Sequence, residues 1–372
     1  MAKKKENLNE NLKYVKLYNW ARTLILSGVM QYGERLPSEH MLERKFNYSR
    51  QTVRSALDVL ENEGLIARQR GSGTYVSFKT GAEDSNRKHI GLILSYFADY
   101  MFPQIYAGIE SVMKEQDIGI DVAVTKNHIN DETVFLERFL KSHASGLIVE
   151  GTRSSFPNPN IALYEKFVKK NIPVIFIHNH YSNIKFDSVE MVDSRCSYSL
   201  TQLLVDNGHK NIGAIFKYDD MQGLERYRGF AECLSDNNIR IDDDRIQWYS
   251  TKEMDSLFTR KGIAALERRF SGCTAVMTYN DEIAASLTLA MTSRGLKVPD
   301  DLSIVSFDNA SLNDFPTLSL CTADHPKFEL GKRAARNLLR MMDDPEWHNN
   351  NYSYRFPVSI VSGNSIKDIH KK

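Results

Sequence analysis

The sequence has few cysteines and no long hydrophobic run. Its 372 residues include only Cys196, Cys233, Cys273 and Cys321, which lie far apart and form no CxxC pair. Isolated cysteines of this kind are typical of reduced thiols in a cytoplasm rather than of a disulfide framework or a zinc site. No apolar run approaches the roughly 18 residues of a membrane-spanning helix, and the polar segment 1–13 contains no secretory signal. We therefore expect a soluble, cytoplasmic protein that does not interact with membranes.

The sequence also lacks the short motifs of common enzyme classes. It contains no GxSxG, P-loop or HExxH pattern. His178 and His180 point two imidazoles the same way on an extended segment, but no third metal ligand is close in sequence, and a pair of solvated or core histidines is the simpler interpretation. We predict no catalytic residue, no metal site and no cofactor. Carboxylates in a cleft leave a sugar-processing enzyme open as an alternative, which incubation with sugars would test.

The net charge of +1 hides an uneven distribution. Residues 1–79 contain 14 Lys and Arg against 8 Asp and Glu, a net charge of +6, whereas the remaining residues contain 34 against 39, a net charge of −5. A basic excess confined to one end of a chain is the electrostatic signature of nucleic-acid binding.

The segment 36–76 has the pattern of two short helices followed by a hairpin. Ser38 and Ser49 are placed to cap the two helices, and apolar residues recur at helical spacing after each cap. Gly64 is placed to end the second helix, and two extended runs then flank the basic, glycine-rich tip 70–73. Because Arg and Gln at a helix N-terminus can bind guanine and adenine in the major groove, Arg50, Gln51 and Arg54 predict a DNA-reading helix.

The same segment resembles the winged helix-turn-helix of the GntR family of bacterial transcription factors. The matching motifs are Leu36–Glu39, Ser49–Arg54, Glu63–Ile66 and Gly71–Val76. His40 departs from the family, in which an arginine is frequent at this position. The resemblance implies contacts to double-stranded operator DNA, and the predicted DNA-binding residues are Ser38, Glu39, His40, Ser49, Arg50, Gln51, Thr52, Arg54, Arg70, Gly71 and Ser72.

After residue 77 the sequence changes character twice. Residues 78–88 are almost free of apolar side chains and read as a linker. Beyond them, short apolar strands alternate with helices in two successive series, which favours two α/β halves with parallel sheets and a cleft between them. We predict a DNA-binding domain over 1–77, a linker over 78–88 and a sensor and dimerisation domain over 89–372.

Polar and aromatic side chains follow successive predicted strands of the sensor. Carboxylates can accept from sugar hydroxyls, Arg, Lys and Asn can donate to them, and aromatic rings can cover a C–H face. Ligands of open parallel sheets bind outside the carboxyl ends of the strands, so these residues predict a sugar site. They are Tyr96, Asp99, Tyr100, Phe102, Glu150, Arg153, Tyr181, Lys217, Asp220, Gln222, Arg226, Asn280, Asp308, Asn309 and His325.

The sensor resembles the effector domain of the LacI/GalR family, which is similar to periplasmic sugar-binding proteins. The matching motifs are Arg226-x-x-Gly-Phe, Tyr279-Asn-Asp, the run from Val298 to Asn309, and Thr322-x-x-His-Pro. The resemblance implies that Arg226, Asn280 and Asp308 contact the sugar, whereas His325 and Asn309 depart from the residues frequent in that family. Joined to a GntR-type head, this sensor resembles the arabinose-responsive repressors of Gram-positive bacteria, which implies L-arabinose or a related sugar as effector and a homodimer on a palindromic operator.

The predicted function is that of a repressor which leaves its operator when sugar closes the two halves of the sensor. Another pentose, a hexose or a nucleoside remains open as the ligand, because hydroxyl-reading side chains do not reveal stereochemistry. A sugar that acts as a co-repressor is also compatible with the residues. The shorter lyase-like and longer aminotransferase-like sensors known in the GntR family do not fit the length of this region.

Overall fold

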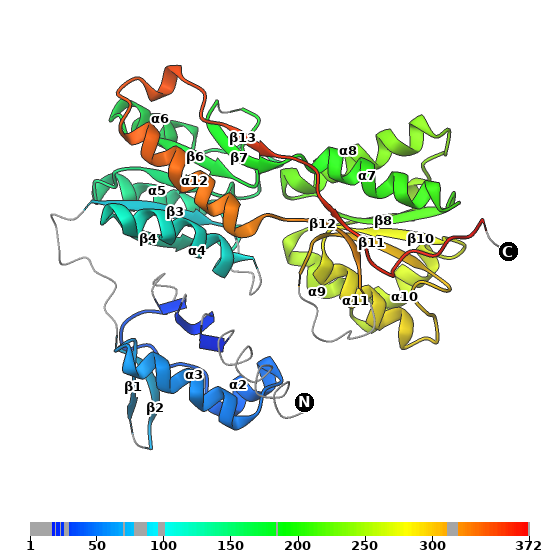
Figure 1. Ribbon diagram of the computed structural model, residues 1–372, viewed down its shortest axis with the longest axis horizontal. Helices are drawn as coiled ribbons and strands as arrows, with labels where there is room; N and C mark the ends of the chain where they lie inside the picture. The colour runs from blue at the N-terminus through cyan, green and yellow to red at the C-terminus, as the bar shows by residue number, and fades with distance from the viewer. Residues whose placement is uncertain are drawn as a thin grey trace.

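The N-terminal head is built from short helices and one hairpin. The computed structural model describes residues 17–18, 20–22, 24–25, 30–69, 71–77, 88–95, 101–183, 185–310 and 319–370. The described residues between 17 and 25 are helical. They are followed by α2 (Glu39–Phe46), α3 (Arg50–Asn62), β1 (Ile66–Gln69) and β2 (Gly73–Val76) (Figure 1).

Local capping and a buried face explain the shape of this head. The Ser38 hydroxyl accepts from the Met41 amide at 3.3 Å, and that of Ser49 accepts from the Thr52 amide at 3.2 Å, so both predicted caps are present. Asn47 ends α2 in the left-handed conformation, and Gly71, at φ 80°, turns the antiparallel hairpin. The apolar face of α3 is buried in the head's own core. The structure confirms the predicted order of helix, helix and wing.

The first lobe of the sensor is a six-stranded parallel sheet covered on both faces. Its strand order is β13-β7-β6-β5-β3-β4. The strands are β3 (His89–Leu94), β4 (Gly119–Val124), β5 (Leu147–Val149), β6 (Val174–Ile177), β7 (Asp187–Met191) and β13 (Tyr354–Phe356). One face packs against α4 (Phe102–Met113) and α12 (Lys327–Met342), and the other against α5 (Ile129–Lys141) and α6 (Ile161–Lys169). Short 3-10 turns follow α4 and α12, at Lys114–Gln116 and Trp347–Asn349.

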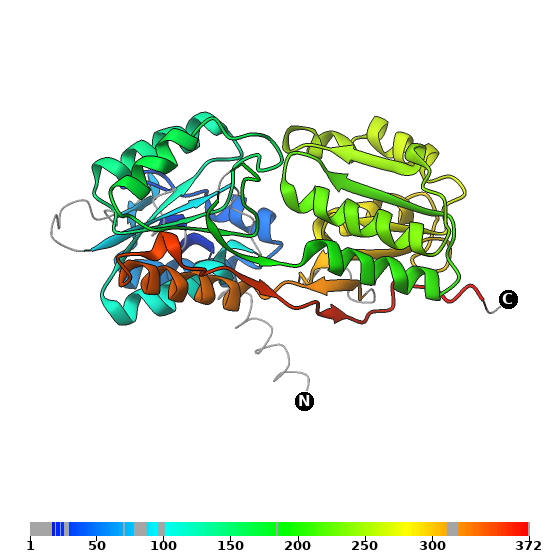
Figure 2. The same ribbon diagram turned by 90° about the horizontal axis from the view of Figure 1, so that it is seen from above.

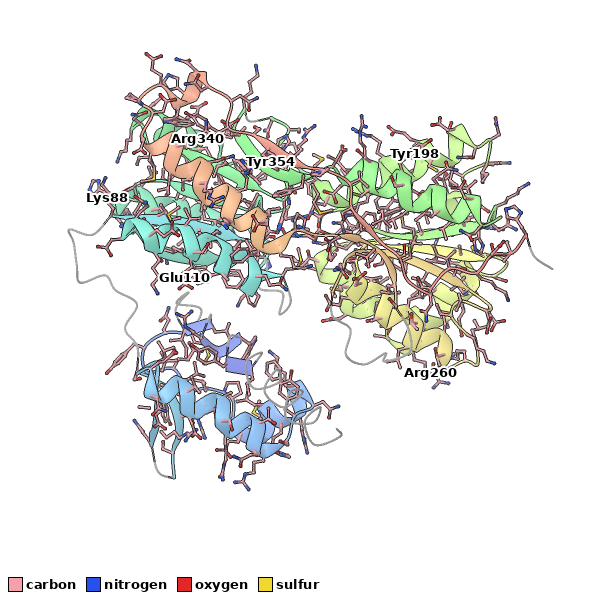
Figure 3. The ribbon with its side chains drawn as sticks, viewed as in Figure 1. Lys88, Glu110, Tyr198, Arg260, Arg340 and Tyr354 are labelled. Atoms are coloured by element: carbon pink, nitrogen blue, oxygen red, sulfur yellow. The ribbon has the colours of Figure 1, made fainter. Side chains whose placement is uncertain are left out.

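The second lobe repeats this architecture. Its strand order is β14-β12-β11-β10-β8-β9, and only β14 pairs antiparallel among these described strands. The strands are β8 (Ile212–Lys217), β9 (Ile246–Tyr249), β10 (Ala275–Thr278), β11 (Ser303–Asp308), β12 (Cys321–Asp324) and β14 (Ile360–Val361). Helices α7 (Asp193–Asp206) and α8 (Met221–Asp236) cover one face, and α9 (Met254–Leu257), α10 (Arg260–Arg269) and α11 (Asp281–Thr292) lie on the other, as the positions of Tyr198 and Arg260 in Figure 3 illustrate. Two 3-10 turns, Asp243–Arg245 and Thr251–Glu253, flank β9.

The chain passes between the two lobes three times in the described residues. The crossings lie between β7 and α7, between β12 and α12, and between β13 and β14. Figure 2 shows the lobes side by side, joined by these connecting segments. The C-terminal segment returns to the first lobe, where α12 packs against α4. Several crossings at one edge form a hinge about which two lobes can open and close.

Some predicted elements differ from those observed. The apolar runs 318–322 and 354–360 of the sequence predict two strands. The first strand instead occupies Cys321–Asp324, and the second run is divided between β13 and β14, one in each lobe. Strand β7 and helix α6 were not predicted. The polar segment 1–13 and residues 78–87 of the predicted linker lie outside the described residues.

Candidate functional site

The recognition helix α3 presents three polar side chains to solvent. Arg50, Gln51 and Arg54 are exposed, and all three come from its first two turns. Thr52 does not join them, because it is buried and its hydroxyl lies 2.8 Å from that of Ser49. Its predicted contact with DNA is therefore corrected to a role in the helix cap. The exposed set is what a helix entering a major groove requires.

Other predicted DNA-binding residues support the reading helix from beside it. Glu39 accepts from Arg50 Nε at 3.3 Å and from Arg54 Nε at 3.0 Å, so in this structure it orients both guanidinium groups. Ser38 and Ser49 use their hydroxyls as caps. His40 is exposed and lies 3.7 Å from Glu43. At the wing, Gly71 and Ser72 are exposed, whereas Arg70 lies outside the described residues.

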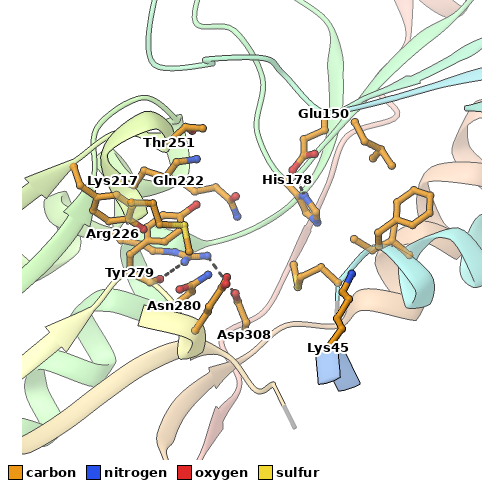
Figure 4. Close-up of a pocket in the computed structure, with 17 residues that line it drawn as sticks. Lys45, Glu150, His178, Lys217, Gln222, Arg226, Thr251, Tyr279, Asn280 and Asp308 are labelled. Carbon is orange, nitrogen blue, oxygen red and sulfur yellow. Dashed lines mark hydrogen bonds and ion pairs between the residues drawn. The ribbon is translucent and has the colours of Figure 1, made fainter. Parts of the chain in front are cut away.

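The second candidate site is a cavity of about 490 Å³ between the two lobes. Figure 4 shows it from the side, with Glu150 and His178 of the first lobe facing residues of the second. The residues that line it are Lys45, Leu94, Met101, Phe102, Ile105, Glu150, His178, Lys217, Gln222, Arg226, Tyr249, Thr251, Met254, Tyr279, Asn280, Glu282 and Asp308. Its volume lies in the range of small-molecule sites.

Arg226 is the central polar group of this cavity. Its side chain is 1% exposed and projects from α8 between the Tyr279 and Phe307 rings. Its Nε donates to Asp193 Oδ1 at 2.8 Å, a terminal nitrogen donates to the Tyr279 carbonyl at 2.5 Å, and the other lies 3.6 Å from Asp308 Oδ1. A buried, forked donor held in one orientation suits the recognition of paired oxygens.

A second charged group lies beside Arg226. Lys217 Nζ donates to Asp220 Oδ2 at 2.9 Å, and the Tyr279 hydroxyl donates to the same carboxylate oxygen at 2.7 Å. Asp220 also caps α8 by accepting from the Gly223 amide at 2.7 Å. Asp220 therefore does not line the cavity as predicted. It lies behind the wall, where it positions Lys217 and Tyr279.

The first lobe contributes the Glu150 carboxylate and the His178 imidazole, and His325 lies beside them on the segment that connects β12 to α12. Burial by itself raises the pKa of the Glu150 carboxyl, but His178 Nδ1 at 2.9 Å and the Ser95 amide, which donates at 2.8 Å, hold that pKa below the usual value. The His178 and His325 rings meet edge to face at 4.9 Å. Burial lowers the pKa of His325 well below its ordinary range. Among the described residues, His178 Nε2 and both nitrogens of His325 are buried and have no hydrogen-bond partner, and such groups are available to a ligand.

The structure places three other predicted ligands away from the cavity. Tyr181 is fully buried in the core of the first lobe, where its hydroxyl donates to Glu132 Oε2 at 2.5 Å. Arg153 lines a separate crevice and stacks over the Phe156 ring. Asn309 is exposed and donates to Asp324 Oδ1 at 2.8 Å. Tyr96, Asp99 and Tyr100 lie outside the described residues.

Several lining residues were not predicted as ligands. His178 appeared in the sequence beside His180, which suggested a pair, but Glu150 holds one imidazole and Glu190 holds the other. Tyr249, Thr251 and Met254 come from β9 and the segment that follows it. Their position at the carboxyl end of a strand could have identified them as candidate ligands, as it identified Lys217.

Two further features of the described residues bear on function. No group of three or more His, Cys, Asp or Glu side chains in this part of the chain is arranged to hold a metal ion. In the same residues, no helix combines the length and the apolar character needed to cross a membrane.

The head and the two-lobed sensor define the class of protein. Residues 13–76 match the family model of bacterial regulatory proteins of the gntR family, and residues 201–366 match that of a periplasmic binding protein-like domain. The crystal structure of the transcription regulator CcpA of Lactococcus lactis is similar, with a TM-score of 0.65, 24% identity, and coverage of 76% of this chain and 100% of that one. A LacI family transcriptional regulator from Enterococcus faecium, solved with bound ribose, has a TM-score of 0.64, 23% identity and coverage of 76% and 100%. These neighbours show the fold of the sensor.

Sequence relatives cover both parts of the chain. An arabinose metabolism transcriptional repressor of Geobacillus stearothermophilus is 35% identical over 332 residues, which is 89% of this chain and 91% of the relative. One from Halalkalibacterium halodurans is 33% identical over 89% of each chain. This chain belongs to the family of transcriptional repressors that these two relatives represent, with a GntR-type head and a LacI-like sensor. It is therefore a DNA-binding regulator and not an enzyme.

Proposed function

We propose that this chain acts as a homodimer that represses transcription and leaves its operator when L-arabinose binds between the lobes of the sensor. The observation that carries this proposal is the cavity itself, in which Arg226 and Asp308 of one lobe face Glu150 and His178 of the other. A ligand that touches both sides favours the closed arrangement of the lobes over the open one. The proposed place of action is the cytoplasm, on the nucleoid.

The charges of the cavity favour a neutral, hydroxyl-rich ligand. Arg226 is balanced by Asp193 and Asp308, and Lys217 by Asp219 and Asp220. Because Arg226 and Lys217 both lie beside carboxylates, this part of the cavity offers donors and acceptors side by side rather than a net positive charge for a phosphate. Vicinal hydroxyls, which donate and accept, match this arrangement. Phe102 and Tyr279 supply the apolar surface for the C–H face of a sugar.

The choice of L-arabinose rests on the names of the relatives. Both repressors that cover 89% of the chain are named for arabinose metabolism. A ribose operon repressor of Haemophilus influenzae is 26% identical over 71% of the chain. Ribose is therefore the pentose to compare with L-arabinose. The proposed ligand contacts are the cavity-lining residues Phe102, Glu150, His178, Lys217, Gln222, Arg226, Asn280 and Asp308, together with His325, which lies against the His178 ring.

The proposed DNA contacts are made by α3 and the wing. A dimer places two copies of Arg50, Gln51 and Arg54 in major grooves about 34 Å apart, or a multiple of that distance. Closing the lobes then changes the spacing of the heads. The coupling is reciprocal, so a sugar that weakens operator binding tenfold, about 1.4 kcal/mol, is itself bound tenfold more weakly on the operator. We retain 1–77 and 89–372 as the two proposed functional units, with 78–88 as the linker.

Titration calorimetry with L-arabinose, D-ribose, D-xylose and D-glucose tests the sensor proposal. We expect L-arabinose to bind most tightly, with one site per chain. The Asp308→Asn variant should lose most of this affinity, because an amide can no longer accept through both oxygens. Equal or absent heats for all four sugars would overturn the choice of ligand. Sedimentation of the purified protein tests the dimer.

A further inference from the structure

Hydrogen bonds join the two lobes along one side of the sugar cavity. Asn127 of the first lobe donates through Nδ2 to Asp219 Oδ2 at 3.0 Å and to Thr251 Oγ1 at 2.9 Å, both in the second lobe. The Ser154 hydroxyl accepts from the Met221 amide at 2.9 Å. Beside it, the Ser155 hydroxyl donates to the Tyr218 carbonyl at 2.7 Å. We call these contacts of Asn127, Ser154 and Ser155 the latch.

Asn127 and Ser154 of the latch, and Asp219 opposite them, are buried although they lie on loops, whereas Ser155 is half-buried. Asn127 is 5% exposed, Asp219 3% and Ser154 1%. A buried polar group without a hydrogen-bond partner destabilises the folded protein. A polar group that moves into water instead replaces its lost hydrogen bond with one to water. These side chains therefore distinguish the closed arrangement of the lobes, in which they bond each other, from an open arrangement in which water reaches them.

The first lobe holds its half of the latch in place. Asn127 Oδ1 accepts from the Arg153 amide at 2.6 Å, and the Asn127 amide donates to the Ser95 carbonyl at 3.0 Å. These two bonds fix the side chain so that its Nδ2 projects toward the second lobe. Because Asn127 has a φ of 60°, its backbone is also in a conformation that asparagine tolerates better than most residues.

The loop that carries Ser154 and Ser155 is fixed by a buried carboxylate. Glu132 is 0% exposed and accepts from the Thr152 amide at 3.3 Å, from Asn158 Nδ2 at 2.8 Å and from the Tyr164 hydroxyl at 3.0 Å. The Tyr181 hydroxyl donates to it as well. This network ties both ends of the loop to α5 and α6. The loop therefore loses little conformational entropy when the lobes meet, so the free-energy cost of closure is smaller.

The latch adjoins the sugar cavity without contacting its central donors. Thr251 lines both that cavity and the neighbouring polar crevice, so the latch forms the wall between them. Asn127, Ser154 and Ser155 line only the crevice or neither space. A change at these positions alters closure while leaving Arg226, Asp308 and Glu150 in place.

We propose that Asn127, Ser154 and Ser155 are positioning residues that set how long the sensor stays closed on its sugar. This inference rests on the proposed function, since it assumes that a sugar binds between the lobes. Bonds made only after closure do not affect encounter, so they act on dissociation. Sugar affinity, and with it the sugar concentration needed for release from the operator, then depends on residues that never touch the ligand.

Stopped-flow fluorescence with L-arabinose tests the proposal on the full-length protein. Asn127→Ala removes two hydrogen bonds between the lobes and should raise the dissociation rate about tenfold, with the association rate unchanged within twofold. Without sugar, its affinity for operator DNA should equal that of the unchanged protein. Ser155→Ala removes one such bond and should give a smaller increase of about threefold. Ser155→Ala therefore still tests the proposal if Asn127→Ala does not fold.

Asn237→Ala is the matched control. Asn237 Nδ2 also donates hydrogen bonds, at 2.8 Å to Gln202, at 2.9 Å to the Cys233 carbonyl and at 3.7 Å to Cys233 Sγ, but both partner residues lie in the second lobe. Its sugar kinetics should not change. Unchanged dissociation in folded Asn127→Ala and Ser155→Ala, or an equal effect in Asn237→Ala, would overturn the latch. If the unchanged protein fails to bind any pentose, the proposed ligand class itself is wrong.

Discussion

Two arginines on α8 allow the buried site to be tested against a surface control. Arg226 is 1% exposed and lies between Asp193 and Asp308, whereas the Arg228 side chain is 58% exposed and pairs with Glu225 and Glu232. Removing one partner of a buried ion pair leaves an uncompensated charge, which costs about 3–5 kcal/mol. An exposed pair contributes about 0–1 kcal/mol.

We therefore expect Arg226→Ala to lower the free energy of unfolding by about 3–5 kcal/mol, and Arg228→Ala by less than about 1 kcal/mol. Urea denaturation followed by circular dichroism measures both values. Burial already raises the pKa of Asp193. Without the guanidinium this pKa rises further, so the deficit of Arg226→Ala should shrink as the pH falls and the Asp193 carboxylate takes up a proton. Similar values for the two variants, or a deficit that grows in acid, would refute the assignment of Arg226 as a buried counter-ion.

Three other changes test separate parts of the molecule. Arg54→Ala should weaken operator binding about 10- to 100-fold in a fluorescence anisotropy titration and leave sugar affinity unchanged. If the variant binds the operator as tightly as the unchanged protein, α3 is not the reading helix. A Cβ on Gly229 would lie 1.8 Å from the Ser194 carbonyl oxygen, so Gly229→Ala should cost at least about 1–3 kcal/mol of stability in urea, and a neutral result would show that α7 and α8 can separate. Burial, followed by the charge of Asp308, raises the pKa of Asp281 to about 6, so the folded state takes up a proton there as the pH falls from about 7 to 5. The unchanged protein should gain stability relative to Asp281→Asn over that interval in thermal melts, and parallel profiles would contradict this.

The fold could be predicted where the signal is local. Ser38 and Ser49 precede their helices as caps, and the apolar runs of the sensor coincide with strands such as β5 and β9. The exception is β7, whose sequence Asp-Ser-Val-Glu-Met contains no apolar run. Ser188 and Glu190 are nevertheless buried there, where hydrogen bonds to other residues satisfy their polar groups. A polar strand of this kind is recognised only when its partners are known.

The candidate site could be predicted as a region but not residue by residue. Parallel strands bring their carboxyl ends to one edge, which is why Lys217, Asn280 and Asp308 line one cavity. The direction of each side chain was not accessible from the sequence. Asp220 and Tyr181 follow strands in the same way, yet one caps α8 and the other is fixed in the core by Glu132.

The partners of the buried groups were equally hidden in the sequence. Nothing in the order of residues shows that His178 faces Glu150 or that Asn127 reaches across to Asp219, because each pair is separated by a long stretch of chain. Contacts of this kind depend on how the two lobes fold and meet. They determine which polar groups remain available to a ligand.

The most direct test of the account is the effect of sugar on operator binding. Fluorescently labelled promoter fragments from the genome that encodes this chain are titrated with the purified protein, with and without L-arabinose. We predict tight, salt-sensitive binding that L-arabinose weakens at least tenfold, while Asp308→Asn binds the same fragment equally well and does not respond to the sugar. Binding that is unaffected by L-arabinose and by every other pentose would contradict the account.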